Sequence, residues 1–451
     1  MSAMYTSNTL SRKETWRLLA LVGAGLAILN ATFQGDGAPL VASIALCGIV
    51  FAVTFGLIRW LGPAFIKAGL KGKDMAKPSR PEIPETMGAV CAVVYLMSLI
   101  MFIPFAFYKD IVAATSGGGN RDVVIESQHI ENGRFLHRFP HGKLASYLSG
   151  LLSLQSVVIL GIGDDLFDIR WRHKVLIPAF SAIPMLIVYF VDFGVTQVVV
   201  PVPLQPYLGD IVDLGWLYYM YMAAVSIFCP NAINMLAGIN GIEVAQSLVI
   251  AIQLLFNDAM YLAPMTPYPH PATDSHLLSI YFLLPFIGVS AALLFHNWYP
   301  SKVFVGDTYC YFAGMVFAVI FNFLYSTPQL FKLIPCPRHR LPKFSASTGL
   351  LDASVTEWTS PPSPLIDTAL RLLHTLRLVR ITQDENGRIT ESSNLTILNL
   401  WLVWMGPMRE DQLAWHIVAV QTVCGMIGLF VRHRLALLVF HHDNREFGFI
   451  P

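Results

Sequence analysis

Residues 87–108 read MGAVCAVVYLMSLIMFIPFAFY, a run of 22 residues without a charged side chain. A helix that crosses the hydrocarbon core of a bilayer needs about 20 consecutive apolar residues. Across the 451 residues of the chain, 55% are hydrophobic and 13% are charged, whereas soluble domains carry roughly 25% charged residues. The composition therefore predicts a polytopic membrane protein rather than a soluble protein of two or three domains.

Nine further runs combine low charge with a length close to that of a membrane span. Residues 18–33 form the weakest run, because they are short and follow Arg12, Lys13 and Arg17. A secretory signal would look similar, but residues 30–32 read NAT, a poor cleavage site, so we interpret this run as an uncleaved first span. The other runs are residues 38–58, 145–163, 175–191, 214–229, 242–262, 277–295, 309–331 and 414–431. The sequence predicts an all-α membrane protein with about ten transmembrane helices.

The positive charges in the loops indicate an orientation. Ten Lys and Arg residues fall in one alternating set of loops and five in the other. The first set comprises residues 59–86, 164–174, 230–241 and 296–308, and the second comprises residues 109–144, 192–213 and 263–276. Because cytosolic loops are richer in Lys and Arg, the first set is predicted to face the cytosol. The formal net charge of +1 gives no reason to expect a nucleic-acid partner.

One polar block interrupts the hydrophobic pattern near the C-terminus. Residues 365–378 have helical periodicity, and residues 379–382 and 388–390 flank an Asp-Glu-Asn-Gly turn signal at residues 384–387. We therefore expect a small cytosolic α+β appendage before the last span. The predicted division of the chain is residues 1–35 as an N-terminal extension with an extra span, 36–334 as a multi-span catalytic domain, 335–413 as the appendage, and 414–451 as the last span and tail.

Residues 161–174 read GIGDDLFDIRWRHK and place acidic and basic groups together at the end of an apolar helix. The adjacent carboxylates of Asp164 and Asp165 repel each other unless a cation or a proton intervenes. Asp168 lies four residues after Asp164 and shares its helical face, and Lys174 follows within about three turns. Such groups at a membrane boundary indicate chemistry, although an Asp/Arg cluster that only stabilises the ends of the spans is the alternative.

Two further segments carry candidate ligands for Mg²⁺. Residues 231–243 read NAINMLAGINGIE, and residues 296–308 read HNWYPSKVFVGDT. The amide oxygen of Asn234 and the carboxylate of Asp307 are hard oxygen donors, and Mg²⁺ takes one or two carboxylates together with substrate phosphates. The alternatives are an Asn-capped, Gly-punctuated loop and an Asp307 that serves only as a helix N-cap.

Residues 335–340 read PCPRHR, a proline-stiffened basic motif. The guanidinium groups of Arg338 and Arg340 on either side of His339 are suited to bidentate recognition of a diphosphate. A basic tether to the membrane surface is the alternative. Residues 77–85, KPSRPEIPE, form a second proline-rich cytosolic loop that would be interpreted as a linker if it stood alone.

Together, PCPRHR, RWRHK and the NAIN…LAGING segment resemble the motifs of the polyprenyl-phosphate phospho-N-acetylhexosamine transferases. The match runs from about residue 40 to residue 431 and points to the eukaryotic branch, the UDP-N-acetylglucosamine–dolichyl-phosphate N-acetylglucosaminephosphotransferases. The resemblance implies transfer of GlcNAc-1-phosphate from UDP-GlcNAc to dolichyl phosphate, with release of UMP, as the first step of dolichol-linked oligosaccharide synthesis for N-glycosylation. It further implies Mg²⁺ as cofactor, the cytosolic face of the endoplasmic reticulum membrane as location, and inhibition by tunicamycin.

The resemblance also assigns roles to individual residues. Asn234 and Asp307 would hold Mg²⁺, Lys174 would contact the phosphates, and Asp164 and Asp165 would organise the acceptor phosphate and the metal. The substrate-binding residues would be Arg338 and Arg340 for the diphosphate and sugar, His339 and Trp171 for the N-acetyl group, and Asn240, Phe304 and Met75 for the uridine, with Glu85 nearby. Because a phosphate acceptor is already ionised at neutral pH, we expect charge neutralisation to matter more than a proton-abstracting base.

One departure from the family concerns the segment after Asp307. The family pattern has two spans before PCPRHR, whereas residues 309–331 provide 23 uncharged residues, which form about 35 Å of helix and therefore one span. Loop parity would then deliver Arg338 and Arg340 to the non-cytosolic face. We accordingly expect a shortened, impaired isoform or gene model that lacks about one helix near residues 320–321.

Three alternative functions remain open at this point. The first is an inactive or regulatory isoform that assembles with a full-length enzyme. The second is a related enzyme that uses another hexosamine or polyprenyl phosphate. A transporter is the third, since acidic groups inside membranes also mark ion pathways, but the polar groups cluster at one face and internal half-repeats are missing. The sequence leaves the oligomeric state open, with a homodimer among the options.

Overall fold

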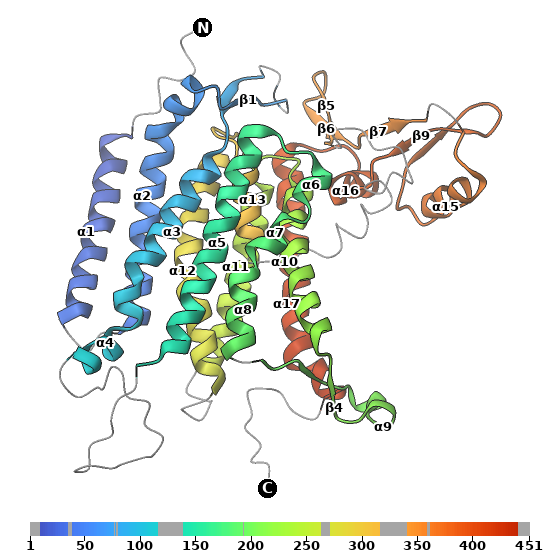
Figure 1. Cartoon of the computed structure of the whole chain (residues 1–451). Helices are drawn as coiled ribbons and strands as arrows, with labels where there is room; N and C mark the ends of the chain where they lie inside the picture. The colour runs from blue at the N-terminus through green and yellow to red at the C-terminus, as the bar shows by residue number, and fades with distance from the viewer. Residues whose placement is uncertain are drawn as a thin grey trace.

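The computed structural model describes residues 10–34, 38–75, 77, 80–115, 139–192, 194–262, 271–315, 341–358 and 361–440. Long helices run side by side in one bundle (Figure 1). They are α1 (Arg12–Gln34), α2 (Pro39–Lys67), α3 (Met87–Ala106), α5 (His141–Phe167), α10 (Trp216–Leu236), α11 (Ile242–Leu262), α12 (Pro271–Asn297) and α17 (Glu410–His433). The shorter helices are α4 (Tyr108–Thr115), α6 (Trp171–Lys174), α7 (Ile177–Ser181), α8 (Ile183–Asp192), α9 (Gln205–Leu208), α13 (Asp307–Gly314), α15 (Pro364–Thr375) and α16 (Ile397–Met405).

Seven helices of the described part of the chain are long and apolar enough to cross a membrane, namely α1, α2, α3, α5, α11, α12 and α17. The predicted number of about ten is therefore not confirmed. The run 175–191 folds as the short helices α7 and α8, where Pro178 and Pro184 lack the N–H group that a continuous helix needs. Helix α10 has 21 residues, but its sequence begins WLYYMYM and also contains Asn231 and Asn234, which make it less apolar. The run 309–331 extends beyond the described residues after residue 315.

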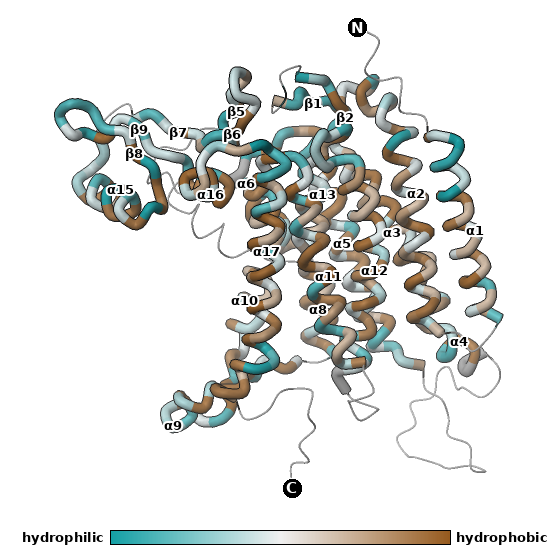
Figure 2. The backbone as a smooth tube through the Cα atoms, turned by 180° about the vertical axis from the view of Figure 1, so that it is seen from behind, coloured by the Kyte–Doolittle hydropathy of each residue, from teal (hydrophilic) through white to brown (hydrophobic). Residues whose placement is uncertain are grey.

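Two short hairpins lie outside the predicted appendage, so the expectation of an all-α membrane domain was too strict. Strand β1 (Lys71–Lys73) pairs with β2 (Glu82–Pro84), and β3 (Gln197–Val199) pairs with β4 (Ile211–Asp213), both antiparallel. Each hairpin closes a loop between helices. Figure 2 shows hydrophobic residues along the long helices and hydrophilic residues gathered mainly at the ends of the bundle and in the region of β7 and α15.

The appendage contains the predicted helix and hairpin. Helix α15 covers residues within the expected helical segment, and β8 (Ile381–Gln383) pairs antiparallel with β9 (Ile389–Ser393) around the Asp-Glu-Asn-Gly turn. The Asp384 carboxylate accepts the backbone N–H groups of Asn386 and Arg388 at 3.0 and 2.8 Å, which explains the turn. The remaining strands are β5 (Lys343–Ser345), which pairs with β6 (Leu350–Asp352), and β7 (Val355–Glu357), which pairs with β9. A small core of Leu370, Val379, Ile389 and Leu395 lies beneath.

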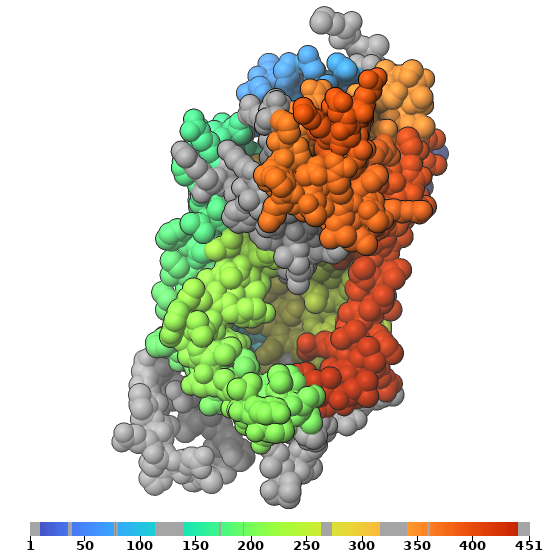
Figure 3. All heavy atoms as spheres, turned by 90° about the vertical axis from the view of Figure 1, so that its right-hand side faces the viewer, coloured from blue at the N-terminus to red at the C-terminus, as the bar shows by residue number. Residues whose placement is uncertain are grey.

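The appendage lies at the same end of the bundle as β1 and α6 (Figure 1). From the side, it overhangs a hollow between α10 and α17 (Figure 3). This arrangement places the described polar segments that were predicted to be functional around one end of the helix bundle.

Helix α13 sits deep in the bundle because small residues allow its neighbours to approach closely. A Cβ atom on Gly161 of α5 would lie 2.7 Å from the Cα atom of Thr308, and a Cβ atom on Gly314 would lie 2.2 Å from the Cα atom of Pro230 in α10. Both distances are far below van der Waals contact, so larger side chains would push α13 away. The glycines thereby let the first turn of α13 pack closely against α5 and its last residue pack closely against α10.

Candidate active site

The segment GIGDDLFDIRWRHK folds back on itself at the end of α5. The helix ends at Phe167, and its C-cap residue Asp168 has a φ of 47°, in the left-handed region. The Asp164 carboxylate accepts the N–H of Ile169 at 3.0 Å. After this turn, α6 brings the ammonium group of Lys174 to 2.6 Å from Asp164 Oδ2. The predicted convergence of acidic and basic groups within this segment is therefore present in the structure.

Lys174 also links this segment to α13. Its Nζ atom lies 3.2 Å from Oδ2 of Asp307, 133 residues further along the chain. The side chain of Asp164 is 1% exposed and that of Asp307 is 36% exposed, so Asp307 is the carboxylate that remains accessible. Burial lowers the pKa of Lys174, but the nearby Asp307 and Asp164 carboxylates outweigh it, and the net effect raises the pKa. Lys174 is therefore a cation at neutral pH.

Asp165 serves the N-terminus of α13 instead of facing Lys174. Its Oδ1 atom accepts the Asp307 N–H at 2.6 Å, and its Oδ2 atom accepts the N–H and the hydroxyl of Thr308 at 3.1 and 2.5 Å. The preceding Gly306 has a φ of +83°, and a Cβ atom there would lie 2.7 Å from the Cα atom of Thr86. The first residue of α13 is Asp307 itself and its N-cap residue is Gly306, so the interpretation of Asp307 as an N-cap is wrong. A carboxylate from α5 satisfies the helix end.

The two predicted metal ligands are neighbours. The Asn234 side chain in α10 donates from Nδ2 to Asp307 Oδ1 at 2.6 Å, which leaves the oxygen of the same amide as a metal donor. Among the described residues, no group of three or more His, Cys, Asp or Glu side chains forms a metal site. One carboxylate and one amide oxygen fit Mg²⁺ only if substrate phosphates complete the coordination, as is common for this ion.

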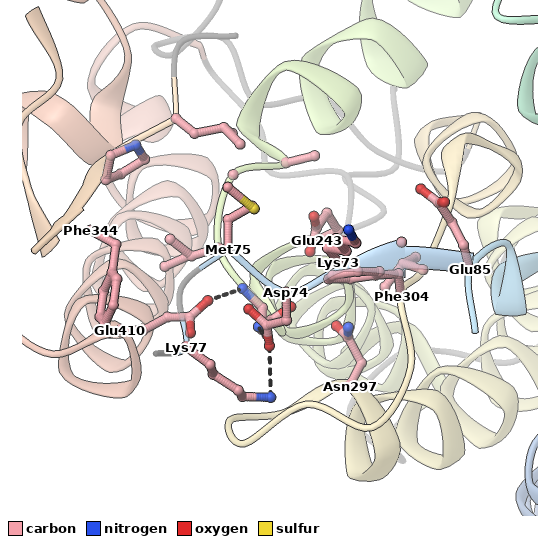
Figure 4. A pocket seen from close by; sticks show the side chains of 18 of the residues that line it. Lys73, Asp74, Met75, Lys77, Glu85, Glu243, Asn297, Phe304, Phe344 and Glu410 are labelled. Atoms are coloured by element: carbon pink, nitrogen blue, oxygen red, sulfur yellow. Dashed lines mark hydrogen bonds and ion pairs between the residues drawn. The ribbon is translucent and has the colours of Figure 1, made fainter. Parts of the chain in front are cut away.

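Asp307 lines a cavity of about 890 Å³ at this end of the bundle. Asn240, which was predicted to shape the uridine site, lines the same cavity. So do Met75 and Phe304, predicted for the same site, and Glu85, predicted to lie nearby (Figure 4). Leu341 and Phe344 at the start of the appendage line it as well. The described part of the appendage therefore lies on the same side of the bundle as Asp307. Loop parity had indicated the opposite face, so that expectation is wrong for these residues.

Glu85 differs from an ordinary surface glutamate. Burial and the negative charges of Asp165 and Asp307 raise its pKa. One of its carboxylate oxygens lies near Gly72, where a Cβ atom would be 3.3 Å from Oε2 of Glu85 and 2.8 Å from the Phe304 ring. Glu85, β1 and Phe304 therefore form one wall of the cavity.

Some predicted residues lie outside the structural description. Arg338, His339 and Arg340 fall within residues 316–340, which the structure does not describe. Trp171 is the first residue of α6, but its side chain is also outside the description.

Sequence reasoning assigned no role to six charged residues of the described cavity wall. They are Lys73, Asp74, Lys77, Arg80, Glu243 and Glu410. Glu410 was placed within the appendage, and the available signal, an acidic residue at the start of the last apolar run, is common at helix N-termini. Only the fold shows that it reaches the cavity.

Comparison with known proteins identifies the family. Residues 147–324 match glycosyl transferase family 4. The chain is 48% identical to the UDP-N-acetylglucosamine–dolichyl-phosphate N-acetylglucosaminephosphotransferase of Saccharomyces cerevisiae, over 95% of this chain and 98% of the relative. The chain belongs to this family. The phosphotransferase of Schizosaccharomyces pombe is 48% identical over 93% of this chain and 97% of its own length, and that of Dictyostelium discoideum is 35% identical over 84% and 86%.

The family comparison gives no support to a shortened chain. The alignment with the yeast phosphotransferase spans nearly the whole length of both proteins. The segment near residues 320–321, where a helix was expected to be missing, lies outside the described residues. The expectation of impaired activity therefore has no support from either source.

Proposed function

We propose that this chain transfers GlcNAc-1-phosphate from UDP-GlcNAc to dolichyl phosphate and releases UMP. Membership in the phosphotransferase family over nearly the whole chain supports this activity. The observation that carries it in the structure is the cavity lined by Asp307, whose carboxylate also contacts Asn234 and Lys174. A carboxylate, an amide and a lysine at the end of a cavity large enough for a sugar nucleotide match a reaction between two phosphorylated substrates.

The metal centre in this proposal consists of Asp307 and Asn234. Both supply hard oxygen donors, and the partly exposed carboxylate of Asp307 is available to a cation. Mg²⁺ bound there would neutralise charge on the diphosphate. Lys174, held between Asp164 and Asp307, would contact the phosphates and adds a positive charge at the same point.

The donor occupies the cavity with its diphosphate beside Asp307. Its uridine extends toward Asn240 and Met75, with Phe304 as an aromatic surface and Glu85 nearby. In this proposal Arg338 and Arg340 bind the diphosphate and sugar, and His339 and Trp171 lie at the N-acetyl group. Leu341 lines the cavity directly after the Arg-His-Arg motif in the sequence, which supports this assignment.

In the reaction, an oxygen of dolichyl phosphate attacks the phosphorus that carries GlcNAc. A new phosphorus–oxygen bond forms, the bond to UMP breaks, and the electron pair leaves with UMP. The attacking phosphate needs no proton removed, so charge stabilisation and orientation carry the rate. Asp164 is almost fully buried and paired with Lys174, and Asp165 is bonded to α13, so both act by positioning.

We place the enzyme in the endoplasmic reticulum membrane with the site facing the cytosol. The excess of Lys and Arg in the loops on that side supports this orientation. The site residues lie at one end of the bundle, which also disfavours a transporter. A homodimer stays a prediction.

The test is synthesis of GlcNAc-diphosphodolichol by the purified chain. We expect product from labelled UDP-GlcNAc and dolichyl phosphate with Mg²⁺, no product with EDTA, and inhibition by tunicamycin. UDP-GalNAc and a bacterial polyprenyl phosphate serve as alternative substrates. An absence of lipid-linked product from UDP-GlcNAc, in a preparation that remains folded, would contradict the proposal.

A further inference from the structure

The loop that carries Asn240 joins α10 to α11 and forms part of the cavity wall. From one side, α12 holds it, because the Asn297 side chain accepts the Gly241 N–H at 2.9 Å and donates to the Val303 carbonyl at 2.8 Å. Gly241 has a φ of +86°, and a Cβ atom there would lie 2.9 Å from the Trp298 ring. The end of the loop at Gly241 therefore packs against the C-terminal end of α12. Asn240 itself is held by other contacts.

Two acidic residues hold Asn240 from the other side. Glu410, the first residue of α17, accepts the Asn240 backbone N–H at 2.8 Å, and Asp74, after β1, accepts a hydrogen bond from the Asn240 side chain at 3.1 Å. Glu410 is 5% exposed, Asp74 is 2% exposed and Asn240 is 7% exposed. Figure 4 shows the labelled Glu410, Asp74 and Lys77 side chains in the same part of the cavity lining. Buried hydrogen bonds to carboxylates are among the stronger ones in proteins.

The charges of this cluster are partly compensated. Lys77 lies 2.6 Å from Asp74 Oδ2 and donates to the Ser301 carbonyl at 2.9 Å. Glu410 is at the N-terminus of α17, where the helix dipole favours a negative charge. Its second oxygen, Oε2, is buried and has no hydrogen-bond partner in the described part of the chain. A buried acceptor without a hydrogen-bond partner destabilises the folded protein. Such a group in a native protein therefore calls for an explanation, such as a functional role.

We propose that Glu410 and Asp74 are positioning residues for the nucleoside of the donor. They hold the backbone and the amide of Asn240 in the orientation that the uridine site requires, and they connect that site to the last membrane helix. The inference rests on the proposed function, because it assumes that Asn240 contacts the uridine. Since the contact is with the part of the donor that does not react, its loss weakens donor binding and leaves the chemical step largely intact.

Glu410 is best tested with two substitutions and one matched control. Glu410→Ala removes the acceptor, whereas Glu410→Gln keeps an amide oxygen that can accept the Asn240 N–H. The control is Asp411→Asn, because Asp411 is next in sequence and its side chain pairs with the exposed Arg409 at 3.0 Å. The measurements are kcat, KM for UDP-GlcNAc and KM for dolichyl phosphate, with thermal denaturation of each purified variant.

For Glu410→Ala we expect KM for UDP-GlcNAc to rise at least tenfold, while kcat and KM for dolichyl phosphate stay within threefold. Glu410→Gln and Asp411→Asn should stay within threefold of the parent in all three constants. A donor KM within twofold of the parent for Glu410→Ala would overturn the proposal, and so would equal losses for Gln and Ala or an equal rise in the acceptor KM.

A third substitution of Glu410 covers the case in which Glu410→Ala does not fold. Glu410→Asp keeps the charge at the helix N-terminus but withdraws the carboxylate by one methylene, so donor KM should rise severalfold at unchanged melting temperature. An unchanged donor KM for this variant would also contradict the role. Failure of the proposed function is separate, because it would appear as a parent chain without UDP-GlcNAc transfer.

Discussion

Replacement of Asp165 by Asn tests whether this residue holds α13 in place or takes part in proton transfer. The carboxylate accepts three hydrogen bonds from the first turn of α13, one on Oδ1 and two on Oδ2. Asparagine offers one oxygen and one N–H₂ group. If the oxygen serves Thr308, the N–H₂ group faces the Asp307 N–H, so one bond is lost and two donors are opposed. A buried donor left without an acceptor costs about 1–3 kcal/mol.

The same change moves the metal ligand. Asp307 is the residue whose N–H loses its acceptor, and a shift of ~1 Å at a reacting centre lowers rates by up to ~10²-fold. We therefore expect Asp165→Asn to lower the melting temperature in detergent by several degrees, to lower kcat by ten- to a hundredfold, and to raise the Mg²⁺ concentration needed for half-maximal activity.

Thermal denaturation and Mg²⁺ titration of transfer activity measure these effects on the same preparation. Thr308→Ala is the matched control, since it removes only the hydroxyl bond and should give a smaller change in the same direction. A loss of activity far beyond a hundredfold, with unchanged melting temperature and unchanged Mg²⁺ dependence of the residual activity, would refute the positioning role of Asp165. That result would favour direct participation in the chemistry.

Three further predictions concern the metal and phosphate groups. Asp307→Ala should abolish transfer at any Mg²⁺ concentration, because the Asn234 amide alone binds the ion weakly; activity within a few-fold of the parent in an Mg²⁺-dependent assay would rule out the metal role. Asn234→Ala should lose activity at low Mg²⁺ and recover part of it at high Mg²⁺, and a loss that Mg²⁺ does not alter would argue against ligation. Arg340→Lys should be nearly as damaging as Arg340→Ala, because lysine lacks the planar two-donor fork; preserved donor KM in the Lys variant would show that charge alone matters.

Local signals in the sequence predicted local structure well. The Asp-Glu-Asn-Gly turn and its flanking residues gave the β8–β9 hairpin, because the side chain of Asp384 bonds within its own turn. The convergence of Lys174 and Asp164 was also predicted, since only ten residues separate them. The left-handed turn at Asp168 was not predicted, because Asp168 was expected to continue the helix. Similarly, residues 175–191 have the composition of a span but fold as α7 and α8. Composition measures apolarity, and it does not measure the hydrogen bonds that proline removes.

Contacts between distant segments could not be predicted from the sequence in the same way. Asp165 bonds to a helix end 142 residues away, and Glu410 bonds to a loop 170 residues away. Each residue has an ordinary local explanation, as an acid at the end of a span or at the start of a helix. Their roles depend on the close approach of α13 to α5, which Gly161 permits, and on the position of α17 beside the cavity.

The charge of the cavity lining explains why the proposed function requires cations besides Lys174. Its described lining carries five acidic residues and three basic ones, namely Asp74, Glu85, Glu243, Asp307 and Glu410 against Lys73, Lys77 and Arg80. A diphosphate that enters such a site is repelled unless positive charge accompanies it. Mg²⁺ at Asp307 and the two arginines of PCPRHR supply that charge in the proposed arrangement. If Mg²⁺ binds as proposed, donor affinity should fall when the ion is removed, even in variants that cannot carry out transfer.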